Sequence, residues 1–552
     1  MSQLKDVFTF YDPSTKVWSG LPRKPFFNPN QSLGDLIFQI LERNAEKVVQ
    51  INADSGVKVT GAEMRLRSIR IAQNLIKLGY SATKLGSEDK FAMIVRNGEH
   101  TASVAFACFA LGIPVSTLDP TFDRDDLSHM LGIVKPKVIF CENEVLDTLF
   151  AACDAIAISP RVFLMEKDVE GYDHLNTLLE PTNNEEAFVP VEIPDPLNHL
   201  AVLLCSSGTT GRSKAVCLSH SICIAYVANF FHCVSTDRTL AFSTLYWLSG
   251  MAALLTSTIW AATRIITRKS FNAELTLDII ERFNVSVALL PTSQALAVAN
   301  SPMGNTAVLR SIRMPLTGGS FVPSSLKRSF ERLIPGRSLE IMYGFSEAAR
   351  AVSFSNGQLY RDGSVGFPAS GTEFKIVDDE NKPLDVNQEG EILVRSEYAF
   401  NGYLGNDDAT KEILDSEGWI HSGDIGRFDE EGYLYVVDRK KEIMKCNGHQ
   451  VSPSEIESVI MTIPGVAACC VVGVPVEILD LPTALVVRKD GTASNPDAAE
   501  IVEKVKESLA WYKHLNGGVY FTNELPLTPS GKVMRRTAKN VLMQIKRQEK
   551  GR

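Results

Sequence analysis

The sequence predicts an α/β fold with a large N-terminal region, a β-rich segment and a small C-terminal α+β unit. Apolar runs of strand length alternate with helical stretches through residues 1–195 and again beyond residue 214, a pattern typical of parallel strands joined by helices. Residues 363–402 change to short strands separated by turns. Because 552 residues are too many for one hydrophobic core, about three or four structural units are expected.

Apolar runs predict the elements of the large region. Residues 91–95 and 138–141 are expected to be strands, and residues 102–111, with small and aromatic side chains, are expected to form a helix. A further helix is expected to begin near Ser221. Other strands are predicted at residues 200–205, 215–218, 285–290 and 315–320.

One apolar stretch, residues 247–266, approaches the length of a membrane span. Hydroxyl side chains interrupt it, and Arg264 lies inside its end. We therefore expect a buried helix that lines a pocket, and no transmembrane segment.

Apolar runs and helix-capping residues also predict the elements of the C-terminal part of the chain. Residues 374–377 and 390–395 predict strands of the β-rich segment. Ser452, Pro453 and Glu455 fit a capping box with proline in the first turn, which predicts a helix over residues 455–460. Two strands, at residues 468–474 and 484–487, and a helix over residues 497–510 are expected to follow.

Composition and charge narrow the class of protein. Hydrophobic residues make up 45% and charged residues 22% of the chain, as in ordinary globular proteins, and the net charge of -9 suggests no nucleic-acid partner. Ten cysteines without a C-x-x-C pair, and a first segment without an apolar signal, predict reduced thiols and an intracellular protein. The ending Lys550-Gly551-Arg552 differs from the peroxisomal Ser-Lys-Leu signal, so a cytoplasmic location is favoured over a peroxisomal one.

Residues 206–214 carry the clearest chemistry, because hydroxyl side chains, two glycines and Lys214 stand together after an apolar run. Glycines let several backbone N–H groups point at one anion, hydroxyls add donors, and lysine adds a charge. Only two residues separate Gly208 from Gly211, so this is not the common P-loop. We expect a phosphate-binding loop; the alternative is a polar turn in a hairpin.

Four further short segments contain residue types that suit ligand binding, but they point to a site only when they are considered together. A glycine pair allows flat contact with a ring, and a carboxylate accepts two hydrogen bonds from a diol. Taken alone, none of these segments identifies a function, because each can also be a turn or a surface charge. In chain order they are Gly318-Gly319-Ser320, Tyr343-Gly344-Phe345-Ser346-Glu347, Gly423-Asp424 and Gly531-Lys532.

In this order, the loop and the four segments resemble the signature motifs of the adenylate-forming enzymes, which include acyl-CoA synthetases, 4-coumarate–CoA ligases and firefly luciferases. The resemblance covers essentially the whole chain. It implies a domain of αβ sandwich subdomains plus a β-rich subdomain over residues 1–437, a hinge at 438–441 and a small mobile domain over 442–552. The chain departs from the family pattern at Ser213 for proline, Ala215 for glycine, and Ala348 for serine or threonine.

The resemblance also implies residue roles. Glu347 would bind magnesium and act in catalysis, Lys445 and Lys532 would be catalytic residues of the small domain, and Lys441 would be the hinge. The implied ATP-binding residues are Ser206, Ser207, Gly208, Thr209, Thr210, Gly211, Lys214, Gly318, Gly319, Ser320, Tyr343, Gly344, Ser346, Asp424 and Arg439. The implied acyl-binding residues are Tyr246, Trp247, Gly250, Met251 and Ala348, and the loop of the coenzyme A step is Cys446, Asn447 and Gly448.

The implied reaction joins a carboxylic acid to coenzyme A at the expense of ATP, with Mg²⁺ as the metal. The acid is expected to be fatty or aryl-alkyl, because an aromatic wall at Trp247 replaces a histidine that the family frequently has there. No obligatory protein partner is implied. Transfer of the acyl group to a carrier protein, a luciferase-like oxygenase and a nucleotide-binding protein without catalysis remain alternatives.

Overall fold

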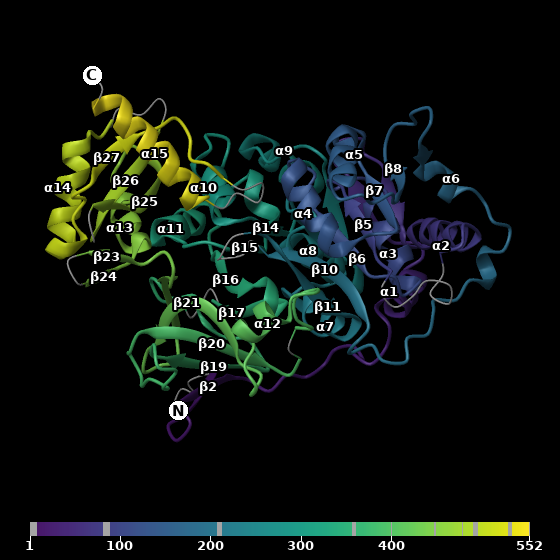
Figure 1. The fold of residues 1–552 in the computed structure, drawn as a ribbon, viewed down its shortest axis with the longest axis horizontal. Helices are drawn as coiled ribbons and strands as arrows, with labels where there is room; N and C mark the ends of the chain where they lie inside the picture. Colours follow the sequence, from purple (N-terminus) through teal and green to yellow (C-terminus); the bar gives the residue numbers. More distant parts are fainter. Residues whose placement is uncertain are drawn as a thin grey trace.

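The structure is a computed structural model that describes residues 8–80, 89–206, 212–355, 360–398, 400–446, 449–476, 479–489, 495–527 and 533–550. Three large sheets are built from residues up to Arg439, and two small sheets follow. The green β-rich sheet and the yellow C-terminal unit lie at one end of the molecule, with the blue N-terminal helices at the other (Figure 1). The predicted α/β class is confirmed.

The first sheet has seven strands in the order β11-β10-β6-β5-β7-β8-β9. Its strands run parallel except for the antiparallel β10–β11 pair. The strands are β5 Phe91–Ile94, β6 Val115–Leu118, β7 Val138–Cys141, β8 Arg161–Leu164, β9 Asp173–His174, β10 Leu200–Ser206 and β11 Lys214–Ser219. The accompanying helices are α2 Gly61–Lys77, α3 Thr101–Ala110, α4 Arg124–Val134, α5 Leu146–Ala155 and α6 Leu175–Leu179.

The second sheet has nine strands in the order β18-β17-β16-β15-β14-β12-β13-β3-β4. The strands are β3 Val48–Asn52, β4 Lys58–Thr60, β12 Arg238–Ala241, β13 Thr263–Ile266, β14 Val287–Leu289, β15 Met314–Gly318, β16 Glu340–Phe345, β17 Arg350–Phe354 and β18 Phe367–Pro368. Its helices are α8 Leu248–Ile259, α9 Ala273–Phe283, α10 Thr292–Asn300 and α11 Ser324–Leu333. The helix predicted over residues 247–266 is therefore too long: it ends at Ile259, and the chain turns through Ala261 (φ 52°) into the buried strand β13.

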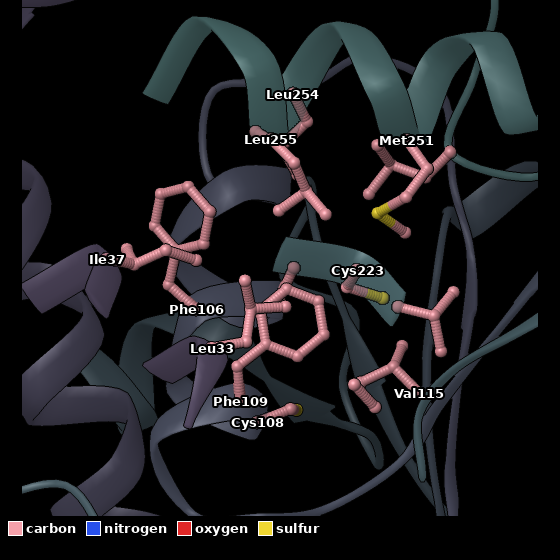
Figure 2. Close-up of a cluster of buried hydrophobic side chains, with 14 of the residues drawn as sticks. Leu33, Ile37, Phe106, Cys108, Phe109, Val115, Cys223, Met251, Leu254 and Leu255 are labelled. Carbon is pink, nitrogen blue, oxygen red and sulfur yellow. The ribbon is translucent and has the colours of Figure 1, made fainter. Parts of the chain in front are cut away.

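The largest hydrophobic core joins helices that are distant in sequence. Figure 2 shows Leu33 and Ile37 packed with side chains from α3, α7 and α8. The contributing helices include α1 Leu33–Arg43 and α7 His220–Ala225. Each fully buried leucine, isoleucine or phenylalanine contributes about 1.5–3 kcal/mol, so this cluster fixes α8, whose first turn reaches the site described below.

The third sheet is antiparallel throughout, in the order β1-β2-β19-β20-β21-β22. Its strands are β1 Thr9–Asp12, β2 Val17–Gly20, β19 Thr372–Val377, β20 Gly390–Ser396, β21 Ile420–Phe428 and β22 Leu434–Arg439, with helix α12 Asp407–Ile413 beside it. The β-rich segment was predicted over residues 363–402, but the sheet extends to Arg439 and includes the N-terminal hairpin. Trp18 stacks on Phe428, with ring centroids 4.6 Å apart, and holds that hairpin in place.

The C-terminal unit is a small α+β arrangement that lies next to α10 and α11 in Figure 1. Its strands are β23 Met444–Cys446, β24 His449–Val451, β25 Val466–Val476, β26 Leu479–Arg488 and β27 Gly518–Phe521, and its helices are α13 Pro453–Ile460, α14 Ala498–Ser508 and α15 Arg535–Lys550. Ser452 caps α13 as predicted, accepting from the Glu455 N–H at 3.3 Å. The Glu455 carboxylate binds Lys513 at 2.5 Å, so the cap forms without the reciprocal half of a capping box.

All ten cysteines fall within the described residues, where each is buried and free of a disulfide. Within the same ranges, no helix is both long and apolar enough to cross a membrane.

Candidate active site

A cavity of about 430 Å³ lies at the carboxyl ends of β10, β15 and β16, where ligands bind in open α/β sheets. It gathers residues from all the separated motifs that fall within the described ranges. Its polar lining includes Ser206, Lys214, Gly318, Gly319, Gly344, Ser346, Glu347, Tyr403, Ser422, Gly423, Arg439 and Lys441. Segments that do not identify a function when each is taken alone therefore meet in one cavity.

The phosphate-binding segment is described at its two ends. Ser206 and Lys214 lie opposite each other in the β10–β11 pair, and both line the cavity. The predicted residues Ser207, Gly208, Thr209, Thr210 and Gly211 lie outside the described residues. Ser213, which stands where the family has proline, is fixed by a contact from α4: its carbonyl accepts a hydrogen bond from His129 Nε2 at 2.8 Å.

Three predicted nucleoside-binding residues meet in a hydrogen-bonded group. The Tyr343 hydroxyl donates to Asp424 Oδ2 at 2.7 Å, and Arg439 Nε lies 3.0 Å from Asp424 Oδ1. Asp424 and Arg439 are cross-strand partners in β21 and β22. Burial and the neighbouring Asp424 raise the pKa of the Tyr343 phenol, which therefore stays a donor at neutral pH. A carboxylate is a suitable acceptor for the two hydroxyls of a diol, and the contacts from Tyr343 and Arg439 fix the orientation of this one.

Tyr403, a residue that the sequence did not indicate, links Glu347 to Lys214 of the phosphate-binding segment. The Tyr403 hydroxyl donates to Glu347 Oε1 at 2.6 Å, and the Lys214 ammonium lies 4.8 Å from the Tyr403 ring centroid. Tyr403 comes from the segment after β20, whose backbone pairs with β11: Leu404 N–H donates to the Ala215 carbonyl at 2.9 Å. This pairing between distant segments has no local spacing in the sequence by which it could be recognised.

The glycine pair at the end of β15 is required by close packing at Gly318 and by backbone conformation at Gly319. A Cβ atom on Gly318 would lie 2.2 Å from the Met342 carbonyl oxygen, and Gly319 has φ of 85°. Gly318 and Gly319 line the cavity, whereas Ser320 is exposed and is not among the lining residues. The pair thus leaves one flat backbone surface on the cavity wall.

The apolar side of the cavity contains one of the predicted acyl-binding residues. Trp247 lines it, together with Phe230, Leu248, Leu289, Pro291, Met342 and Phe345. Four other predicted acyl-binding residues are not on this wall. Met251 is fully buried in the core of Figure 2, and Tyr246 packs against Phe122 with ring centroids 5.3 Å apart. Gly250 serves packing, because a Cβ there would lie 1.9 Å from the Thr244 carbonyl, and Ala348 is buried in another cluster.

Residues 440–442 connect the large and small units, and ion pairs fasten the two ends of this segment to different units. Lys440 Nζ lies 3.0 Å from Glu391 and 3.1 Å from Asp379, both in the β-rich region. Glu442 Oε2 accepts from Arg535 Nε at 2.7 Å within the C-terminal unit. Lys441 stands between these two anchors and lines the cavity.

Of the two small-domain lysines predicted for catalysis, Lys445 falls within the described ranges and is not among the residues that line this cavity. Lys445 lines a separate cavity of about 1060 Å³ between the β-rich sheet and the C-terminal unit. Cys446 is buried, and burial followed by the nearby Asp480 raises its thiol pKa to about 11, so it is no thiolate nucleophile. Asn447, Gly448 and Lys532 lie outside the described residues.

A magnesium ion fits this site only as a partner of a phosphate ligand. In the described ranges, no cluster of three or more His, Cys, Asp or Glu side chains could hold a metal alone. Glu347 is a carboxylate in the same cavity as Lys214. Mg²⁺ is commonly held by one or two carboxylates plus substrate phosphates, and Glu347 beside a phosphate loop supplies that donor set.

Two family models match this chain. The family model described as AMP-binding enzyme matches residues 38–404, and the model of the AMP-binding enzyme C-terminal domain matches residues 455–532. The chain belongs to the adenylate-forming, AMP-binding enzyme family.

Relatives match over nearly their full length. The chain is 30% identical to 4-coumarate–CoA ligase 1 of Arabidopsis thaliana, with 92% of each chain covered. It is 28% identical to luciferin 4-monooxygenase of Nipponoluciola cruciata, with 94% of this chain and 96% of that protein covered. A benzoate CoA ligase from Burkholderia xenovorans shares the fold with a TM-score of 0.81 at 19% identity, covering 92% of this chain and 99% of that one.

Proposed function

We propose that the protein is an acid–CoA ligase that works through an acyl-adenylate. One observation carries the proposal: a single cavity has Lys214, Glu347 and Arg439 on its polar side and Trp247 on its apolar side. Such a cavity fits a nucleotide polyphosphate beside an apolar carboxylic acid. The 4-coumarate–CoA ligases among the relatives support the same class of reaction.

The proposed reaction has two steps. A carboxylate oxygen of the acid attacks the α-phosphorus of ATP; the new P–O bond forms as the bond to the bridging oxygen breaks, and pyrophosphate leaves. The thiol sulfur of coenzyme A then attacks the acyl carbon, loses its proton, and displaces AMP. Both steps bring negative groups together, so Lys214 and a cation at Glu347 would stabilise the charge that develops.

The residues would divide the substrates between them. Asp424, held by Tyr343 and Arg439, would accept hydrogen bonds from the ribose hydroxyls, and the 318–319 backbone would face the adenine ring. Mg²⁺ bound between Glu347 and the phosphates would neutralise the triphosphate charge. Trp247 would contact the acyl chain, and we infer a fatty or aryl-alkyl acid because the wall beside it is apolar.

We further propose that the small unit changes its orientation about Lys441 between the two steps. The flanking residues are fastened to opposite units, Lys440 to Glu391 and Glu442 to Arg535, so the backbone torsions of Lys441 can change without breaking either anchor. Lys532 would serve adenylate formation and Lys445 thioester formation. The domain boundary at residues 438–441 and a cytoplasmic location complete the proposal.

One coupled assay tests the proposed function. AMP release is measured with ATP, Mg²⁺ and a panel of acids of graded length, with and without coenzyme A, and the thioester is identified by mass. We expect acid-dependent AMP release that coenzyme A accelerates. Light emission with luciferin and oxygen would support an oxygenase, and release accelerated only by an acyl-carrier protein would support a carrier-dependent enzyme.

A further inference from the structure

Tyr403 contacts two groups of opposite charge at once. Its hydroxyl donates to Glu347 Oε1 at 2.6 Å, while its ring faces the Lys214 ammonium at 4.8 Å. All three side chains line the 430 Å³ cavity. In the described part of the chain, no ion pair joins Lys214 to Glu347, although both groups line this one cavity.

An ion pair between these two groups would compete with both expected ligands. A lysine engaged by a carboxylate must break that contact before it can bind a phosphate oxygen, and the carboxylate must do the same before it can bind a cation. A cation–π contact is a weaker hold on an ammonium than a carboxylate in a partly desolvated site. The ring therefore restrains Lys214 while leaving it able to bind an anion.

The position of Tyr403 is set by the strand that carries Lys214. Tyr403 is 7% exposed and forms a β-bridge with Val216 of β11. Its N–H donates to Thr410 Oγ1 at 2.9 Å, and Phe400 packs edge-on against its ring with centroids 5.4 Å apart. The ring is thus fixed by backbone pairing and packing before any ligand binds.

We propose that Tyr403 is a positioning residue that separates Lys214 from Glu347 and keeps each open to its own ligand. The ring holds the ammonium for phosphate oxygens. The hydroxyl orients Oε1 of Glu347 and leaves Oε2 free for a divalent cation. This inference rests on the proposed function only in taking ATP and a divalent cation as the ligands of the cavity.

Two substitutions distinguish the role of the Tyr403 hydroxyl from the role of its ring. Tyr403→Phe keeps the ring and removes the hydroxyl, so Mn²⁺ binding in the presence of ATP should weaken about three- to tenfold while metal-free ATP binding stays within twofold, as expected for one lost hydrogen bond to a charged group. Tyr403→Leu removes the ring as well. Lys214 and Glu347 can then pair, and metal-free ATP binding should weaken about tenfold.

A double variant tests the separation directly. Adding Glu347→Gln to Tyr403→Leu removes the competing carboxylate, so metal-free ATP affinity should recover to within about threefold of the wild type, since one cation–π contact is then the only loss. A structural role for Tyr403 cannot produce this recovery. Tyr398→Phe is the matched control, because Tyr398 packs on Tyr226 with centroids 5.9 Å apart and is not among the cavity-lining residues.

The affinities are measured on the full chain by calorimetry for ATP in chelator and by electron paramagnetic resonance for Mn²⁺, with thermal melting as the folding control. If the double variant binds ATP as weakly as Tyr403→Leu, or Tyr403→Phe leaves Mn²⁺ binding unchanged, the proposal is overturned. Should Tyr403→Leu fail to fold, the Tyr403→Phe result decides. A wild type that binds Mn²⁺ and ATP but makes no thioester would contradict the proposed ligase and leave this test intact.

Discussion

Arg535 binds Glu442 through Nε and Oε2 at 2.7 Å, which joins the first turn of α15 to the residue that follows Lys441. The same guanidinium donates to Glu457 Oε2 at 3.0 Å and to the Val471 carbonyl at 2.9 Å. α13, β25 and α15 are therefore fastened by one side chain. In the sequence, Lys532 precedes Arg535 by three residues (535 − 532).

Arg535→Met should destabilise the C-terminal unit by about 3–5 kcal/mol, because it leaves the largely buried Glu457 without its cation. Hydrogen exchange of peptides from α13 and α15 in the full chain measures this loss. Arg536→Met is the matched control, since Arg536 is exposed and its loss should change stability by less than about 0.5 kcal/mol. Equal protection in the two variants would show that the Arg535 network does not stabilise the unit.

Lys214→Ala should slow adenylate formation by roughly one to three orders of magnitude, the range for losing a strong electrostatic contact to the transition state. The structure places Lys214 at the cavity, opposite Ser206 in the β10–β11 pair. Acid-dependent exchange of labelled pyrophosphate into ATP, measured under saturating ATP, reports the effect. A rate equal to that of the wild type would remove Lys214 from the reaction.

Elements that depend on neighbouring residues could be predicted from the sequence, whereas contacts between distant segments could not. Strands β5, β7 and β10 were predictable because buried parallel strands are continuous apolar runs. The N-terminal hairpin was not, since its place depends on Trp18 meeting Phe428, far along the chain. Tyr403 was missed for the same reason, as its contact with Glu347 arises only when its segment pairs with β11.

The predicted acyl-binding residues show a second limit of prediction from the sequence. An apolar helix in sequence does not reveal which of its side chains face a cavity and which face the core. Trp247 precedes α8 and lines the cavity, whereas Met251, one turn later, points into the core of Figure 2. Periodicity identifies a buried helix but not the side that a ligand meets.

Trp247→Ala should widen the apolar side of the cavity and shift the preferred acid toward longer or bulkier chains. The KM for ATP should stay within about threefold, because Trp247 lies on the side opposite the nucleotide-binding residues in the proposed arrangement. Ratios of kcat/KM across acids of graded length measure the shift. An unaltered acid profile with weakened ATP binding would place Trp247 outside the acyl site.

The two lysines of the small unit should act in different steps. Lys532→Ala should block adenylate formation by about two to three orders of magnitude while still converting supplied acyl-adenylate to thioester. Lys445→Ala should impair the second step more than the first, and Lys441→Pro should restrict reorientation and slow thioester formation. Single-turnover kinetics on each half-reaction separates these effects. Equal losses in both steps for both alanine variants would mean that reorientation does not divide their roles.

Acid-dependent exchange of labelled pyrophosphate into ATP, measured without coenzyme A, tests the central claim most directly. The exchange reports reversible formation of an acyl-adenylate and needs no second step. The proposed site predicts exchange that requires both an apolar carboxylic acid and a divalent cation, and that Glu347→Gln reduces by at least about tenfold. Binding of ATP without exchange for any acid in the panel would contradict it.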